Sequence, residues 1–321
     1  MRARQHHYLP AAYLSGFADP VSREKTGKDV VYVYEPGKPI RAANPRKEAR
    51  VRDLYSLESH PQPDAVETHL SGLEAAGLAA IRAIRIGERL FTSKEREALA
   101  QFMGVMFTRT PAAMKYSEEV AGPAANRIVL KLATDAEQFA AIWTELTGDA
   151  PEAPFAEEAR QKILNGWYEK NETKDDSVVS MLAVGQMAAE EMANLHWQVI
   201  RTSRHAAFIT SDFPIIGARR EGNRVSLGVG FTHPNSDFFF PLSRSLMLRM
   251  ASDLEEGHGY IPPRGARLAN GYFMRYAEKR IFASVRSDRI LSEFERLHGE
   301  VRLGFNALVP IWEGKPILEE E

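Results

Sequence analysis

The chain has 321 residues, of which 44% are hydrophobic and 26% are charged. This composition is typical of a globular protein with a sizeable core and excludes a largely disordered chain. The formal net charge of −2 at pH 7 gives no electrostatic signature of non-specific nucleic-acid binding, although a local basic groove is compatible with it. The absence of cysteine excludes disulfides, thiolate nucleophiles and zinc sites built on cysteine.

Neither a signal peptide nor a membrane-spanning segment is visible in the sequence. The N-terminal residues lack the continuous apolar stretch of a signal peptide. No run of 18 apolar residues occurs anywhere in the chain, so no transmembrane helix is expected. We therefore expect a soluble, cytoplasmic protein with no membrane partner.

The first part of the chain, residues 1–60, contains an unusual stretch, QHHYLP, at residues 5–10. Pro10 fixes its own φ and disfavours helix at Leu9, so we expect the two histidines on extended backbone. A short helix should follow, with Pro10 at its first position and Gly16 just past its end. This helix would hold the N-terminal arm against the body of the protein.

A β-hairpin is predicted next. The alternating run VVYVYE at residues 30–35, the turn Pro36-Gly37 and the segment 39–41 have the composition of two short strands and their connection.

Residues 61–197 are predicted to be helical. The first helix covers about residues 64–89. Thr92 and Glu95 then form a capping-box pattern that opens a helix through about Lys115. Further helices are expected at residues 122–147, 157–169 and 177–196.

Residues 198–321 are predicted to be rich in β-strands. Strand-like runs separated by turn residues occur at residues 197–201, 206–212, 224–232, 236–242, 245–250 and 279–285. A loop at residues 255–265 and a helix at 270–276 interrupt them. We therefore predict one α+β domain with an N-terminal arm and hairpin, a helical middle region and a C-terminal, mainly antiparallel sheet. If the early hairpin joined the late sheet, the N-terminal histidines would lie near it.

Three groups of polar residues are candidates for a functional site, and the first is His6-His7. Adjacent residues on extended backbone point to opposite faces, so at most one histidine is expected in a site and the other is structural. The alternative is that both bond to nearby backbone groups and anchor the arm.

The second candidate is Arg109. On a helix it shares one apolar face with Phe102, Met106 and Ala113, so its charge requires a carboxylate, carbonyl groups or an anionic ligand. Pro111 is expected to kink the chain here. A structural ion pair, with Glu74 or Asp212, and anion binding both remain open at this point.

The third candidate is Ser211-Asp212, which follows the apolar residues 206–209. Ligand residues often lie on loops at the ends of strands, but an aspartate before proline can also simply cap its own turn. No standard catalytic or phosphate-binding motif is present. A divalent metal site could be assembled from His7, Glu74 and Asp212, although no spacing requires one.

These stretches resemble a widespread, uncharacterised bacterial family, domain of unknown function 4238. The resemblance is carried, in this order, by QHHYLPAAYLSGFAD at 5–19, VYVYE at 31–35, DAVETHLSGLE at 64–74, QFMGVMFTRTP at 101–111, FITSDFP at 208–214 and FPLS at 240–243. The positions that match the family pattern are His6, His7, Glu74, Arg109, Thr110, Pro111, Ser211, Asp212 and Pro214, with a closing motif at Asn270 and residues 277–282. A charged helical insert at about residues 120–175 departs from this pattern. Because the matching residues are mostly polar and scattered along the chain, a shared cleft is the economical explanation.

The combination of histidine, arginine and aspartate without cysteine leads us to expect a hydrolase of a phosphate-bearing substrate, for example a nuclease. One histidine, His7 rather than His6, would act as general acid or base near neutral pH. Arg109 would hold phosphate oxygens. Asp212 would orient the histidine or bind a divalent cation, and Ser211 would donate a hydrogen bond.

The residues expected to contact the ligand are Arg109, Glu74, Thr110 and Asn270. The alternative function is a non-catalytic binding or interaction module, in which the same side chains form a structural polar network. A protein that only binds nucleic acid is disfavoured by the net charge. The sequence leaves open whether the substrate is a small molecule or a nucleic acid, and it leaves the oligomeric state open.

Overall fold

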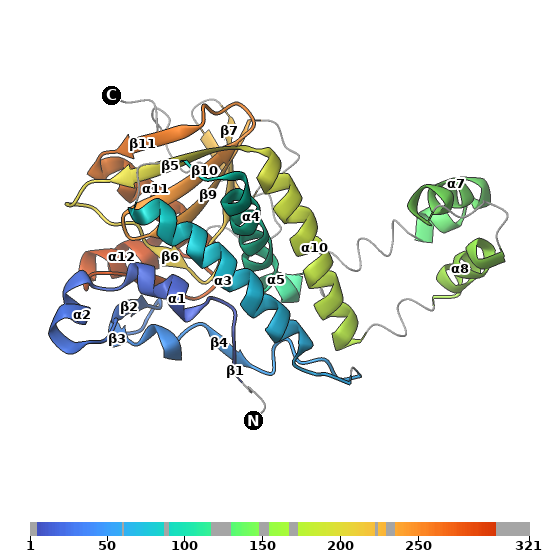
Figure 1. The fold of residues 1–321 in the computed structure, drawn as a ribbon, viewed down its shortest axis with the longest axis horizontal. Helices are drawn as coiled ribbons and strands as arrows, with labels where there is room; N and C mark the ends of the chain where they lie inside the picture. Colours follow the sequence, from blue (N-terminus) through green and yellow to red (C-terminus); the bar gives the residue numbers. More distant parts are fainter. Residues whose placement is uncertain are drawn as a thin grey trace. The chain divides into compact units, whose positions relative to one another are not determined.

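The computed structural model describes residues 5–59, 61–86, 90–116, 130–147, 154–166, 173–221, 224–228 and 235–299. The fold is α+β, as the sequence predicts (Figure 1). The chain forms two compact units, one of Met1–Ala113 together with Met181–Glu321 and the other of Met114–Ser180. The second unit spans the region of the predicted charged insert. The elements of the first unit carry all the candidate residues.

The N-terminal arm is extended and paired, as expected. Strand β1 (Gln5–His7) pairs antiparallel with β4 (Arg50–Arg52) and places His6 opposite Val51. Helix α1 (Ala11–Leu14) and the 3₁₀ turn η1 (Ser15–Phe17) follow, with Pro10 as the residue before the helix rather than its first residue. Leu14 and Phe17 are fully buried and hold the arm to the body. Helix α2 (Pro20–Thr26), capped by Asp19, comes next, and the 3₁₀ turn η2 (Pro45–Lys47) precedes β4.

The predicted hairpin is present and joins strands from the end of the chain. The four-stranded sheet has the order β3 (Arg41–Ala43), β2 (Val31–Tyr34), β12 (Ile281–Ala283), β6 (Thr210–Ser211). All its pairs are antiparallel. This sheet is separate from the larger C-terminal sheet, and the histidines of β1 pair with β4 instead.

The middle region is helical, as predicted. Its helices are α3 (Ala65–Ile86), α4 (Ser93–Thr108), α5 (Pro111–Tyr116), α7 (Ala136–Thr147), α8 (Pro154–Leu164) and α10 (Lys174–Asn194). The capping box of α4 is confirmed, because Thr92 and Glu95 each accept a hydrogen bond from the other's backbone N–H. α4 does not continue to Lys115. It ends at Thr108, with Arg109 as its C-cap, because the ring of Pro111 cannot continue the hydrogen-bond ladder and begins α5 instead.

In the described part of the chain, the large sheet has six strands. Their order is β11 (Gly257–Ile261), β5 (His196–Thr202), β10 (Leu246–Ala251), β9 (Ser236–Ser243), β7 (Ile216–Glu221), β8 (Arg224–Leu227). It is antiparallel except for the β11–β5 pair, which confirms the mainly antiparallel prediction.

Two local predictions in this region were wrong. Residues 206–209 do not form a strand, because their backbone N–H groups bond elsewhere: Phe208 donates to Arg244 O and Ile209 to the side chain of Asn270. Residues 255–265 are not a loop. They contain β11 and the first turn of α11 (Pro263–Tyr276), in which Pro263 occupies a position at the helix start where a missing N–H costs nothing.

The large sheet has a helical layer on each face. Alternate residues of a strand point to opposite faces, and in β9 Phe238 and Phe240 belong to the core shared with α3, α4 and α10. Phe239 between them, with Met247 of β10, belongs to the core shared with α11. All eight residues of β9 are buried, as expected for a strand covered on both faces. Helix α12 (Asp288–Leu297) packs against α11 through Phe294 and Leu297.

Candidate functional site

Arg109 lies at the C-terminal end of α4 and is fully buried. Its Nη1 donates to Glu74 Oε1 over 2.7 Å, and its Nε donates to Tyr8 O over 2.9 Å. Its Nη2 lies 3.3 Å from Met106 Sδ. The buried guanidinium is therefore paired and hydrogen-bonded within the chain. Glu74 is one of the two ion-pair partners that the sequence analysis considered for Arg109.

The two histidines have different surroundings. His6 is fully buried, accepts a hydrogen bond at Nδ1 from Tyr55 N over 2.9 Å, and stacks on the Tyr55 ring at a centroid distance of 5.6 Å. The Tyr55 hydroxyl donates to Arg109 O over 2.8 Å, so Tyr55 connects His6 to Arg109. His7 is only half-buried, and its Nε2 lies 3.2 Å from Arg46 O. The pair points to opposite faces, as extended backbone requires.

Asp212 and Ser211 bond to backbone groups near their own strand. Asp212 is 4% exposed, and its carboxylate accepts from Glu278 N, Lys279 N and Arg280 N at 2.7 to 2.9 Å. Burial raises the pKa of Asp212 to about 7, while the three N–H donors act in the opposite direction. The Ser211 hydroxyl donates to Phe213 O over 2.6 Å. Asp212 thus holds the turn that leads into β12.

The other two predicted ligand residues also bond to backbone. Thr110 Oγ1 accepts from Ala113 N over 3.1 Å and caps α5. Asn270, on α11, accepts from Ile209 N and donates to Ala207 O, at 3.1 and 2.9 Å. The Asn270 side chain thus makes hydrogen bonds to the backbone of residues 206–209 that a neighbouring strand would otherwise make.

The structure therefore brings the predicted residues into two groups rather than one. His6, Glu74 and Arg109 are linked through Tyr8 and Tyr55. Ser211 is the last residue of β6 and Asp212 follows it, and among the described residues no hydrogen bond joins them to either histidine or to Arg109. Within that same part of the chain, no three His, Asp or Glu side chains gather in a way that could hold a metal ion. The divalent metal site considered for His7, Glu74 and Asp212 is therefore not formed.

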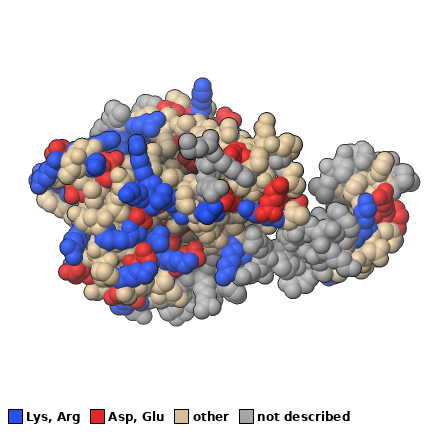
Figure 2. Space-filling model, turned by 90° about the horizontal axis from the view of Figure 1, so that it is seen from below, with Lys and Arg blue, Asp and Glu red and all other residues tan. Residues whose placement is uncertain are grey.

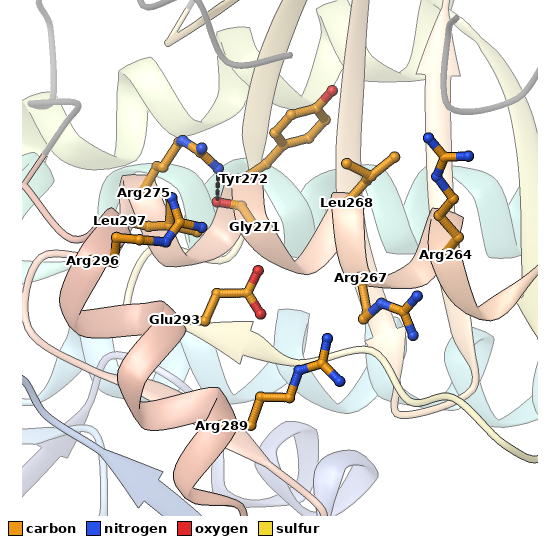
Figure 3. A pocket seen from close by; sticks show the side chains of 10 residues that line it. All are labelled: Arg264, Arg267, Leu268, Gly271, Tyr272, Arg275, Arg289, Glu293, Arg296 and Leu297. Carbon is orange, nitrogen blue, oxygen red and sulfur yellow. Dashed lines mark hydrogen bonds between the residues drawn. The ribbon is translucent and has the colours of Figure 1, made fainter. Parts of the chain in front are cut away.

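A cavity lies elsewhere, between α11 and α12. Lys and Arg side chains are interspersed with Asp and Glu over the face drawn in Figure 2, as expected for balanced overall charge. The charged side chains that line the cavity, by contrast, are mostly positive. Its volume is about 320 Å³, and five arginines and one glutamate line it. These charged residues are Arg264, Arg267 and Arg275 of α11 and Arg289, Glu293 and Arg296 of α12 (Figure 3). We call this cavity the arginine cleft.

Helix geometry explains why these side chains converge. Arg264, Arg267 and Arg275 are spaced three and eight residues apart, which places them along one face of α11. Arg289, Glu293 and Arg296 are spaced by four and three residues and line one face of α12. Because the two helices pack against each other through buried apolar residues, the two charged faces border the same space.

A second cavity of about 190 Å³ adjoins the first, since Arg267, Arg289 and Glu293 line both. Its polar lining includes Asn270 and Ser284. We call it the Ser284 cavity. Asn270 is thus the one predicted ligand residue that lines either of these two cavities.

The sequence prediction missed the arginine cleft. A stripe of arginines at helical spacing in PPRGARLANGYFMR was visible in principle. The loop that the sequence predicts at residues 255–265, with a helix that begins only at Asn270, leaves Arg264 and Arg267 outside the predicted helix, whereas both belong to α11.

Comparison with known proteins gives one match. The chain matches the family model described as "Protein of unknown function (DUF4238)" over residues 5–287. No curated protein and no solved structure matches it. No helix among the described residues is long and apolar enough to cross a membrane. Since the matched region covers most of the chain and includes both groups of predicted residues, the chain belongs to the DUF4238 family of proteins of unknown function.

Proposed function

We propose that this protein binds a phosphate-bearing ligand in the arginine cleft. The observation that carries the proposal is the concentration of five arginines around one cavity, in a chain whose formal net charge is −2. Guanidinium groups bind phosphate oxygens through paired, charge-assisted hydrogen bonds. The chemistry of the lining therefore selects anions, and phosphate in particular.

Most of the arginine side chains that line the cleft have guanidinium N–H groups available to bind a ligand. Arg275 Nη1 donates to Gly271 O over 3.2 Å (Figure 3). In the part of the chain that the structure describes, the side chains of Arg264, Arg267, Arg289 and Arg296 make no hydrogen bond or ion pair. Like charges held on two packed helices repel one another, and a bound anion would relieve that repulsion. This supports a binding role over a purely structural one.

Hydrolysis of the bound ligand is the second candidate function, in line with the sequence-based expectation. Its support is the phosphate-binding chemistry proposed for the arginine cleft, since Asp212 does not line the cleft and its carboxylate bonds to three backbone N–H groups. The hydrogen bonds of His6, Arg109 and Asp212 favour the other expectation, a binding module in which these side chains form structural networks. A phosphatase assay with p-nitrophenyl phosphate separates the two. Turnover by the wild type that disappears in Arg267→Gln/Arg289→Gln supports hydrolysis in the cleft, whereas no turnover by the wild type supports binding alone.

Calorimetric titration with inorganic phosphate tests the proposed binding. We expect the double variant Arg267→Gln/Arg289→Gln to bind at least about tenfold more weakly than the wild type, since one charge-assisted hydrogen bond contributes about 1.5–3 kcal/mol. The matched control is Arg23→Gln/Arg52→Gln, whose side chains are 76% and 62% exposed outside the cleft. Equal phosphate affinity in the wild type and the cleft variant would refute the proposal.

A further inference from the structure

The Ser284 cavity provides a place for the rest of the ligand. We propose that the ligand is a phosphate monoester whose organic group is compact, aliphatic and furnished with one hydrogen-bonding atom, and that this group occupies the Ser284 cavity. The inference rests on the proposed function, because it takes the arginine cleft as the phosphate site.

The two cavities meet at charged side chains. Arg267 of α11 and Arg289 of α12 line both, and Figure 3 shows the two side chains extending into the space between the helices. A phosphate held by these two guanidinium groups would lie at the boundary. An ester group attached to it could then enter the Ser284 cavity without displacing the phosphate.

The lining of the Ser284 cavity indicates an aliphatic occupant. Most of its residues carry apolar aliphatic side chains, namely Ala206, Ala207, Ile209, Ala266, Met274, Ala283, Val285 and Ile290. Among the lining residues, His205 is the only one with an aromatic ring. Proteins that hold a nucleobase commonly stack it on aromatic side chains. This cavity has little surface of that kind, and its aliphatic walls favour burial of methylene groups, at about 0.8 kcal/mol each.

One polar residue that lines the cavity has a side-chain oxygen with no partner among the described residues. Ser284 is 2% exposed, and its Oγ is buried with no hydrogen-bond partner among the described residues. Leaving such a group unpaired costs about 1–3 kcal/mol, so a ligand atom that bonds to it would recover that free energy. Asn270, by contrast, already bonds to Ile209 and Ala207 and serves as a fixed part of the wall.

Calorimetric titration of the full chain with four probes tests the inference. The probes are inorganic phosphate, butyl phosphate, 4-hydroxybutyl phosphate and adenosine 5′-monophosphate. Burial of several methylene groups predicts that butyl phosphate binds at least about tenfold more tightly than inorganic phosphate. The hydroxybutyl ester should bind more tightly still, because its hydroxyl can bond to Ser284.

Two variants assign the gain to this cavity. Ala206→Leu adds bulk to its half-buried wall and should abolish the advantage of butyl phosphate while leaving inorganic phosphate affinity unchanged. Ala79→Leu, at an exposed position of α3, is its control and should keep that advantage. Ser284→Ala should abolish only the difference between the hydroxybutyl and butyl esters. Unchanged affinity for inorganic phosphate also verifies that each variant is folded.

The outcomes separate this inference from the proposed function. If inorganic phosphate does not bind to the wild type, the proposed function fails. If it binds but butyl phosphate binds no more tightly, only the inference fails. A gain with adenosine 5′-monophosphate alone would contradict an aliphatic occupant, and a gain that survives Ala206→Leu would place the organic group elsewhere.

Discussion

Glu74 accepts a hydrogen bond at Oε1 from Arg109 Nη1 over 2.7 Å, and the two members of this ion pair differ in their access to water. The Arg109 side chain is fully buried, whereas that of Glu74 is 23% exposed. A charge left alone in the interior is far more costly than one that water can reach. The pair joins α3 to the end of α4. Because only one member is fully buried, removing Glu74 and removing Arg109 should change the free energy of unfolding by different amounts.

Glu74→Ala should therefore destabilise the protein by about 3–5 kcal/mol, because it leaves a buried guanidinium uncompensated. Arg109→Met should cost less, about 1–3 kcal/mol, since the remaining carboxylate is hydrated and mainly the bond to Tyr8 O is lost. Urea denaturation measures both. Glu97→Ala, at an exposed position on α4, is the control and should change stability by less than about 0.5 kcal/mol. Equal effects of the Glu74 and Arg109 variants would contradict the asymmetry.

The two adjacent histidines should respond differently to substitution. His6→Ala removes the acceptor of the Tyr55 N–H and should cost about 1–3 kcal/mol, because that donor is left buried and unpaired. His7→Ala should change stability by less than about 0.5 kcal/mol, since water can replace its contact with Arg46 O. Thermal unfolding of the two variants makes the comparison. A larger loss from His7 would show that His6 is not an anchor of the arm.

Asp212 should make stability depend on pH. Its pKa is raised from an ordinary value of 3.8 to about 7 in the folded protein, so between these values the folded state binds more protons than the unfolded state. Its contribution to stability is therefore fully present below about pH 4 and is lost as the pH rises through 7. The free energy of unfolding of the wild type, minus that of Asp212→Asn, should decrease over this range. A difference that stays flat or increases would mean that the three N–H donors outweigh burial.

Close packing of α4 and α10 should make Gly104 intolerant of a side chain. A Cβ at Gly104 would overlap the carbonyl oxygen of Gly185 and lie 2.9 Å from Ala189 Cβ. Gly104→Ala should therefore cost about 1–3 kcal/mol through overpacking. Gly72→Ala is the matched control at an exposed position of α3, where nothing lies within 4 Å of the added Cβ.

At that control position alanine should stabilise the helix by up to about 1 kcal/mol. Denaturation of the two glycine variants side by side gives the sign of each effect. If Gly104→Ala is as well tolerated as Gly72→Ala, the two helices are less tightly packed than their contact indicates.

Local sequence signals predicted much of this fold. The capping box of Thr92 and Glu95, the extended backbone before Pro10 and the hairpin around Pro36-Gly37 are encoded within a few residues and formed as expected. At Pro111 the sequence predicted only a kink within a helix through about Lys115, whereas α4 ends at Thr108 and α5 begins at Pro111. The residues at 206–209 were misjudged because their hydrogen bonds are made by Asn270 and by Arg244, far away in the sequence.

The sequence by itself determined the α+β class, the resemblance to a family and the need of the Arg109 charge for a partner, because residue patterns and side-chain charge can be read from the chain alone. Only the tertiary structure decided that Glu74 is its partner and that Asp212 caps the turn before β12. The arginine cleft also exists only in three dimensions. Arg267 and Arg289 belong to different helices, and a shared cavity arises because α11 and α12 pack against each other, a long-range arrangement that no single stretch of sequence encodes.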